Sequence, residues 1–326
     1  MAQRDDKFGM NCDLSVSIIL CTRNRAADLQ QALQALGKLR IPSRWRAEVL
    51  IVDNGSTDTT SSVVRDAHLE NMDVRYLYEA KTGKAHALNS GLTAAHGEML
   101  LFTDDDVLVT EEWAEELVSY LMNGTSDAAT GRIMLAPYLL RPWQRPVHRC
   151  FLASSDDARP HEGSRELIGA NMGLRRSVLK RVPSFDPELG PGALGLGEDT
   201  LFGWQLIEAG FTIEYAPKAV VLHQPHASRL RRVHWLDEAR KHGRSEAYRR
   251  YHWKHEDVSH PCLRWLALWT KLHVRRVLQP PPSFESEGGP LWELSYVKNM
   301  ELCKQFRLER QHTRHYRRRG LVKVIH

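Results

Sequence analysis

A short apolar run that ends in three consecutive aspartates places the strongest constraint on this chain. Residues 99–102 are apolar and follow Gly97, a pattern that predicts a buried β-strand. Asp104 to Asp106 come directly after this run. Three adjacent carboxylates repel one another, and a hard divalent cation such as Mg²⁺ or Mn²⁺ is a suitable counter-charge. An exposed acidic turn before the next helix is the alternative, and the three aspartates alone leave both interpretations open.

The same pattern recurs along the first half of the chain, where apolar runs alternate with helical periodicity. Such alternation predicts βαβ units and a mostly parallel sheet of the Rossmann-like α/β class. Parallel strands end at one shared edge, which is where open α/β sheets bind ligands. Thr22, Arg23 and Asp53 follow or end two of these runs, so we expect them to meet the three aspartates. The predicted strands are 14–20, 48–52, 74–78, 99–104 and 128–135, and the predicted helices are 27–39, 57 onward, 84–95 and 111–122.

The chain beyond residue 136 gives weaker signals. Residues 137–160 contain four prolines and predict an irregular surface segment. A helix is expected to carry Arg175 and Arg176. Two short strands are expected at 211–215 and 219–222.

A glycine-rich stretch in the second half predicts a flexible loop. Residues 190–197 hold four glycines and one proline in eight positions. The stretch ends in Glu198 and Asp199, which open a predicted helix. His223 comes directly after the last predicted strand.

Charge is distributed unevenly along the chain. Residues 1–228 carry 23 Lys and Arg against 30 Asp and Glu, whereas residues 229–326 carry 22 against 10, a net charge of +12. A strongly basic segment indicates an anionic partner. Nucleic-acid binding through this segment is one alternative, but no known nucleic-acid-binding fold accompanies the basic residues. We therefore expect no nucleic-acid partner.

We expect three segments: a flexible N-terminus at 1–13, a catalytic domain at 14–228 and a basic helical extension at 229–326. Residues 1–13 are polar and lack the apolar core of a secretion signal. No apolar run reaches the roughly 18 residues of a membrane span. The five cysteines are scattered, as is usual for reduced thiols. These features predict a cytoplasmic protein.

One helix of the extension combines apolar and basic sides. Within 262–278 the spacing of the apolar residues places them on one side of the predicted helix, and the spacing of the basic residues places those on the opposite side. This pattern predicts contact with the anionic inner face of a membrane. Packing of the apolar side on the catalytic domain is the alternative. The basic cluster at 314–319 is expected to be frayed. The apolar positions are Leu263, Leu266, Trp269 and Leu272, and the basic positions are Arg264, Lys271 and Arg275.

Several short motifs together resemble the family 2 inverting glycosyltransferases, which have the GT-A fold. They occur in that family's order between residues 14 and 225 and do not reach the extension. Leu88 is a departure, since many members carry Arg before the residue that matches Asn89, and the form here is closer to the cellulose-synthase-like branch. The QxxRW motif and membrane spans of that branch are missing, so the resemblance implies transfer of a single sugar. The matching motifs are Thr22 to Arg25, VDNGSTD at 52–58, GKAHALNSGL at 83–92, Asp104 to Asp106, Gly169 to Asn171, and Gly197 to Asp199.

The resemblance implies a role for each matching residue. Asp199 of the ED motif is implied as the general base. Asp104 and Asp106 form the implied DxD motif, in which Asp106, together with His223, binds Mn²⁺ or Mg²⁺. The implied nucleotide-sugar-binding residues are Thr22, Arg23, Asp53, Lys84, Asp104, Asp105, Asn171 and Glu198.

The implied reaction is transfer of one sugar from a nucleotide-sugar, most simply a UDP-sugar, to a hydroxyl group. The implied acceptor is a saccharide or a lipid-linked acceptor in polysaccharide or glycolipid synthesis. Such a transfer needs a stabilised diphosphate, a deprotonated acceptor hydroxyl and alignment of the two. Structural roles are the alternatives for single residues: Asp53 or Asp199 as a helix cap, Lys84 as a solvated charge, His223 as a structural histidine. A nucleotidyltransferase is an alternative of the same class, since it shares an α/β sheet and an acidic metal site. However, residues 22–27 lack the glycine-rich loop that such enzymes use. A catalytically inactive sugar-nucleotide binder also stays open.

Overall fold

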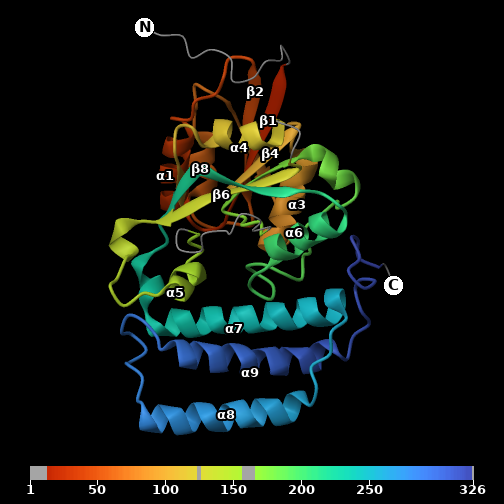
Figure 1. Cartoon of the computed structure of the whole chain (residues 1–326). Coiled ribbons are helices and arrows are strands. Elements are labelled where there is room, and N and C mark those ends of the chain that lie inside the picture. Colours follow the sequence, from red (N-terminus) through yellow and green to blue (C-terminus); the bar gives the residue numbers. More distant parts are fainter. Residues whose placement is uncertain (1–12, 123–125, 156–165, 325–326) are drawn as a thin grey trace.

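The computed structural model describes residues 13–122, 126–155 and 166–324, and the N-terminus that was expected to be flexible lies almost entirely outside them. A sheet domain occupies one end of the molecule, and three long helices lie side by side across the other end (Figure 1). The prediction of an α/β fold with a helical C-terminal extension is confirmed.

One sheet holds eight strands within the described residues, in the order β3-β2-β1-β4-β7-β6-β8-β5. Strands β1 to β4 form its parallel half, as the alternating pattern predicted. The other half is mixed, because β7 runs antiparallel to both β4 and β6, and β5 runs antiparallel to β8. The strands are β1 Leu14–Thr22, β2 Trp45–Asp53, β3 Asp73–Tyr78, β4 Met99–Asp104, β5 Val107–Val109, β6 Ala128–Leu135, β7 Asn171–Arg175 and β8 Ile213–His223.

Helices cover both faces of the sheet because its strands are apolar on both sides. Ile18 of β1 belongs to a core with α1 and α4, whereas the next residue, Ile19, belongs to a core with α3 and α6. The helices are α1 Ala26–Leu36, α2 Thr60–Arg65, α3 Lys84–Ala94, α4 Trp113–Met122, α5 Pro146–Phe151, α6 Glu198–Glu208, α7 Arg232–Tyr248, α8 Pro261–Leu278 and α9 Leu291–Glu309.

Three local predictions were wrong, each because tertiary contacts outweigh local pattern. Arg175 ends strand β7, which pairs with two neighbouring strands, and a 3₁₀ turn follows at 176–180 instead of the expected helix. The two short strands expected at 211–215 and 219–222 are one strand, β8, whose pairing with β6 shifts register between Gly131 and Arg132. Part of 137–160 is regular, since it contains α5; residues 156–160 lie outside the described residues.

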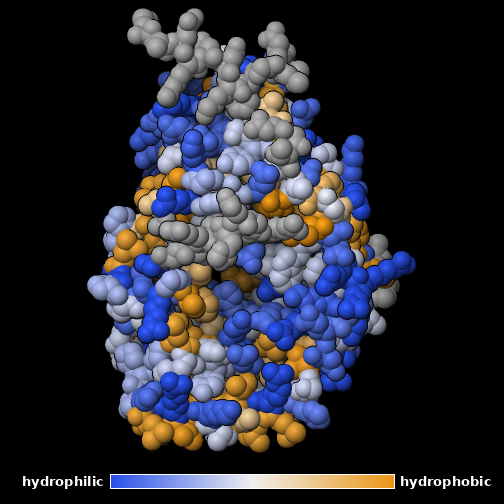
Figure 2. All heavy atoms as spheres, in the orientation of Figure 1, coloured by the Kyte–Doolittle hydropathy of each residue, from blue (hydrophilic) through white to orange (hydrophobic). Residues whose placement is uncertain are grey.

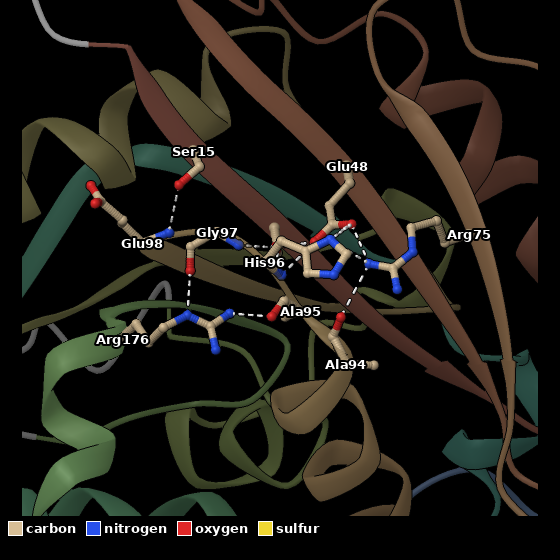
Figure 3. A network of polar contacts seen from close by, with 10 residues as sticks. Ser15, Glu48, Arg75, Ala94, Ala95, His96, Gly97, Glu98 and Arg176 are labelled. Carbon is tan, nitrogen blue, oxygen red and sulfur yellow. Dashed lines mark hydrogen bonds and ion pairs between the residues drawn. The ribbon is translucent and has the colours of Figure 1, made fainter.

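A buried carboxylate at the far end of the sheet from the acidic residues has a structural explanation. Glu48 accepts hydrogen bonds from the hydroxyl of Ser17, from Arg75 and from the backbone N–H of His96 (Figure 3). Arg176 donates to the carbonyl of Gly97 in the same region, at 2.7 Å. These contacts fix the turn that leads from α3 into β4. They therefore hold the strand that ends in the three aspartates.

The C-terminal helices form a stack on the sheet domain. Trp235 of α7 packs in a core with Leu135 and Leu152 of the sheet domain, α9 packs on α7, and α8 lies outermost on α9 (Figure 1). The expectation of a frayed 314–319 segment was wrong. Tyr316 is buried and donates a 2.8 Å hydrogen bond to Asp186. None of the described helices is both long and apolar enough to cross a membrane.

Candidate active site

A cleft of about 520 Å³ opens at the C-terminal edge of the parallel strands. Its walls come from the ends of β1 and β4, the glycine-rich loop before α6, and one side of α7 (Figure 1). In the space-filling view, hydrophilic side chains lie to the right of and below the hollow above the helical stack, and hydrophobic ones lie to its left (Figure 2). The predicted site residues that line the cleft are Thr22, Arg23, Lys84, Asp104, Asp105, Asp106, Glu198, Asp199 and His223.

The three aspartates take different partners although they are consecutive. Asp104, the last residue of β4, accepts a 2.5 Å contact from the ammonium group of Lys84 at the start of α3. Asp105 accepts a hydrogen bond from Thr22 at 2.8 Å. Arg25 bridges the other two carboxylates, with Nη1 at 2.9 Å from Asp105 and 2.7 Å from Asp106. The acidic run is therefore partly neutralised by two cations of the chain itself.

Burial and neighbouring charges act differently on the two inner carboxylates. Burial raises the pKa of Asp105 to about 7, because the attraction of Arg25 only partly offsets the loss of water and the repulsion of Asp106. Burial acts in the same direction on Asp106, but the hydrogen bond from His223 and the charge of Arg25 outweigh it and hold the pKa well below its usual range. Asp106 is thus the member of the pair that stays ionised.

His223 and Asp106 face each other at one wall of the cleft. Nδ1 of His223 lies 2.8 Å from the carbonyl oxygen of Leu152, which can only accept a hydrogen bond, so Nδ1 carries a proton. Nε2 then faces Oδ1 of Asp106 at 3.4 Å. A histidine whose outer nitrogen donates to a backbone carbonyl is the usual geometry of a metal ligand.

The pair fits a divalent cation that takes its remaining ligands from elsewhere. Within the described residues, no three or more His, Cys, Asp or Glu side chains converge in a metal-binding arrangement. Mg²⁺ and Mn²⁺ are commonly held by one or two protein groups together with substrate phosphates and water. Asp106 and His223 supply such a pair of protein donors.

Glu198 and Asp199 open α6 at the opposite side of the cleft. Gly197 precedes them with a φ of 91°, and a Cβ there would lie 2.0 Å from Nη1 of Arg249, so glycine permits this close turn. Oδ2 of Asp199 accepts from the N–H of Gly169 at 2.9 Å. Burial and the charge of Asp199 raise the pKa of Glu198 to about 7. The two neighbouring acids therefore differ in environment, with Asp199 the more exposed.

The glycine-rich loop is fastened to the start of α3. The N–H of Lys84 donates to the carbonyl of Pro191 at 2.9 Å. At Gly192 a Cβ would lie 2.9 Å from the Cα of Gly83, so the two backbones approach closely. The loop thereby brings α6 next to the ion pair of Lys84 and Asp104.

Two predicted site residues do not line the cleft. Asp53 is buried and accepts hydrogen bonds from the hydroxyl of Tyr76 and the N–H of Ser56, both at 2.8 Å. Asn171 is completely buried and bonds to the ring N–H of Trp113. Its amide group also donates to the carbonyls of residues 132 and 219, which joins β7 to β6 and β8. The side chain of Asn171 is therefore used in the core.

The family model described as Glycosyl transferase family 2 matches residues 17–182, which is 166 of the 326 residues. The chain belongs to glycosyl transferase family 2. Within the match lie most of β1, the acidic end of β4 and strand β7, whereas α6, His223 and the helical stack lie beyond it.

Known proteins extend the likeness past this segment. The pre-mycofactocin glycosyltransferase of Mycobacterium tuberculosis is 30% identical over 241 residues, which is 71% of this chain and 47% of that protein. The chain thus spans about half the length of this relative.

Solved structures share the fold of this family 2 glycosyltransferase. The mannosyltransferase PcManGT from Pyrobaculum calidifontis, in complex with GDP-Man and Mn²⁺, superposes with a TM-score of 0.50 at 18% identity, over 89% of this chain and 69% of that one. TarS 1-349 of S. aureus superposes with a TM-score of 0.51 at 18% identity, over 91% of this chain and 92% of that one. Both proteins share the GT-A fold that was expected.

Sequence reasoning missed several cleft residues of this family 2 glycosyltransferase. Arg25 was noted only as part of a motif, although an arginine just after a strand end is well placed to meet acids at the neighbouring strand end. Arg229, Lys241 and Arg244 line the cleft from the extension, and Lys241 also lines an adjoining hollow of about 310 Å³. Lys241 and Arg244 lie three positions apart on α7 and so share one helical face, but nothing local shows what that face meets.

Proposed function

We propose that this chain transfers one sugar from a nucleotide-sugar donor to a hydroxyl group of a saccharide or lipid-linked acceptor, with inversion at the anomeric carbon. A UDP-sugar is the proposed donor. The observation that carries the proposal is the convergence, in one cleft, of the acidic strand end, the pair formed by Asp106 and His223, and the carboxylate of Asp199.

The donor is proposed to lie along the ends of β1 and β4. Thr22 and Arg23 are proposed to contact the base and ribose, with Asp104 and Asp105 on the ribose side. Lys84 is proposed to add positive charge near the diphosphate, although it is bound to Asp104 in the free protein. Asp53 could contact the base after giving up its hydrogen bond from Tyr76.

Asp106 and His223 are the proposed ligands of Mn²⁺ or Mg²⁺. When bound, the cation would stabilise the negative charge of the leaving diphosphate. The solved structure of PcManGT contains Mn²⁺ and GDP-Man, which supports a cation-assisted reaction for this fold. Arg25 already carries positive charge at the same carboxylates, so it is proposed to help hold the diphosphate.

Asp199 is the proposed general base. Its carboxylate is held by the N–H of Gly169, lines the cleft and is partly exposed, so an acceptor hydroxyl can reach it. The hydroxyl proton would pass to Asp199 as the oxygen attacks the anomeric carbon from the face opposite the diphosphate. Buried Glu198, with its raised pKa, can stay protonated beside it and avoid a second negative charge.

Thermal unfolding with a set of nucleoside diphosphates, with and without Mn²⁺, tests the donor assignment. A true donor nucleotide should raise the melting temperature by mass action, and more so with the cation. NMR of the anomeric configuration of the product then tests inversion. Retention of configuration, or equal stabilisation by every nucleotide with EDTA present, would contradict the proposal.

The division into a catalytic domain at 14–228 and an extension at 229–326 is also part of the proposal, with α7 completing the acceptor side of the cleft. The proposed location is the cytoplasm, at the inner face of a membrane. The net charge of +12 in the extension supports this placement.

A further inference from the structure

The outermost helix of the stack exposes a continuous apolar surface. The lower rim of the space-filling view, where Figure 1 places α8, is lined with hydrophobic residues (Figure 2). We call this surface the outer stripe. Its residues recur at helical spacing on one side of α8, which identifies them as one face. They are Leu263, Leu266, Val274, Val277 and Leu278, with exposed fractions of 65%, 53%, 53%, 78% and 75%.

The outer stripe is not the surface that holds α8 on the protein. Leu272 is buried, and Trp265 and Leu268 pack in a core with Phe306 of α9. The sequence pattern had grouped Leu272 with Leu263 and Leu266 on one side of the helix, and this grouping was wrong. The helix is apolar on two sides, so packing on the protein does not account for the outer one.

Positive charge flanks the outer stripe. Arg264 and Lys271 are exposed and lie seven positions apart, so they share one flank of the helix. Residues 261–278 contain four Lys and Arg and no Asp or Glu. Trp269 is partly exposed at the opposite flank, with its ring packed on His273. Basic residues and tryptophan beside an apolar face are the composition of helices that lie in a lipid interface.

We propose that the outer stripe of α8 lies in the surface of an anionic lipid bilayer, parallel to its plane. This inference rests on the proposed location at the inner face of a membrane, and it adds the surface of the protein and the partner that this surface contacts. Charge complementarity favours an anionic bilayer over a second copy of this chain as the partner of the outer stripe. A second copy of this chain on the same stripe would bring two basic flanks together, whereas an anionic bilayer accepts the apolar face and both cations at once.

This orientation restricts the acceptor. Helices α9 and α7 separate α8 from the cleft (Figure 1). Packed helices lie roughly 8–10 Å apart, so the axes of α7 and α8 are about 16–20 Å apart. Side chains of α7 line the cleft. A lipid-linked acceptor therefore reaches Asp199 only if several sugar units extend it from the lipid, so we infer that the enzyme elongates a glycan rather than attaching the first sugar.

Co-sedimentation with vesicles tests the surface directly and requires no donor or transfer. The full chain is mixed with phosphatidylcholine vesicles that contain or lack phosphatidylglycerol, at low and high salt. We expect binding to the anionic vesicles that weakens with salt. The double variant L266E/V277E should bind at least about tenfold more weakly, since a carboxylate in the lipid interface is costly and is repelled by anionic lipid.

Leu308→Glu is the control, because Leu308 is exposed on α9 to a degree similar to Leu266 and lies outside the outer stripe. It should bind vesicles like the unchanged protein, and all variants should keep the same melting temperature. Absence of vesicle binding at any salt, or equal binding by L266E/V277E, would overturn the proposal. A dimer that the double variant converts to a monomer, without vesicle binding, would overturn it in favour of a second copy.

The length of the acceptor is tested separately. Transfer to a lipid-linked monosaccharide in anionic vesicles should be at least about tenfold slower than to the same lipid carrying an oligosaccharide. Vesicle binding is measured without sugar transfer. Loss of vesicle binding would therefore contradict only the membrane surface, and absence of sugar transfer would contradict only the proposed glycosyltransferase activity.

Discussion

Nε2 of His223 lies 3.4 Å from Oδ1 of Asp106, while Nδ1 of the same ring donates to the carbonyl oxygen of Leu152. Both side chains are buried, so Nε2 and the carboxylate face each other with little water between them. Either a proton on Nε2, donated to Asp106, or a bound cation offsets the charge of the carboxylate. A structural role and the proposed metal role therefore share this geometry and differ in their response to Mn²⁺.

The metal assignment predicts that His223→Ala loses Mn²⁺ binding. Removing one of two protein donors should weaken binding by about 100-fold or more, as measured by electron paramagnetic resonance of free Mn²⁺ in the presence of a nucleoside diphosphate. His68→Ala, an exposed histidine elsewhere on the surface, is the control. Unchanged Mn²⁺ affinity in His223→Ala would show that the histidine is structural.

Arg25 should stabilise the cation-free protein. Arg25→Met leaves Asp105 and Asp106 without their bridging cation, and we expect a loss of about 1–3 kcal/mol in the free energy of unfolding in EDTA. Mn²⁺ should restore part of this loss, because it neutralises the same carboxylates. Urea unfolding measures both effects. Arg46→Ala, which removes a surface pair, should unfold like the unchanged protein in EDTA and in Mn²⁺.

The general-base assignment predicts that Asp199→Asn binds the donor nucleotide normally and transfers about 10²–10⁴-fold more slowly. The reason is that the carboxylate acts on the acceptor proton. Calorimetry and single-turnover assays separate the two effects. Glu208→Gln at the other end of α6 is the control and should be near normal. Near-normal turnover of Asp199→Asn would place the base elsewhere.

The variant Asn171→Ala tests whether Asn171 has a structural role or binds the nucleotide-sugar. Asn171→Ala leaves the ring N–H of Trp113 and two carbonyl groups without their partner in the core. Each unsatisfied group costs about 1–3 kcal/mol, so the melting temperature should fall clearly. Nucleotide affinity, measured below that temperature, should stay unchanged. A stable protein with weak nucleotide binding would instead support the ligand role implied by the resemblance.

Glu198 should make stability depend on pH. Its pKa rises from 4.5 to about 7 on folding, because burial and Asp199 disfavour the ionised form. The folded state then binds more protons at Glu198 than the unfolded state does between these two values. The contribution of Glu198 to stability is therefore fully present below about pH 4.5 and is lost as pH rises through about 7. Urea unfolding across this range, compared with Glu198→Gln, measures the effect. The same slope in both proteins would contradict it.

The sequence alone predicted the edge of the sheet at which the candidate site lies. Continuous apolar runs force buried parallel strands, and parallel strands place their C-terminal residues together. Thr22 and Asp104 to Asp106 meet for this reason. The N-terminal position of Asp199 in α6 was equally readable, since a glycine and two acids mark the helix start.

Tertiary packing decided the rest. Asn171 to Arg175 form a strand only because β4 and β6 offer hydrogen-bonding edges, which no local pattern records. The side chains of α7 line the cleft because Trp235 fixes that helix on the sheet domain.

The sequence by itself determined which residues are apolar, which are charged and which strand ends they follow. It could not determine which of the two apolar sides of α8 turns inward. Leu272 is buried and Leu263 is exposed because α9 covers one side only, and that choice depends on the position of a helix that begins 13 residues later in the chain. Long-range packing energy is shared between distant segments, so it leaves no local sign in either of them.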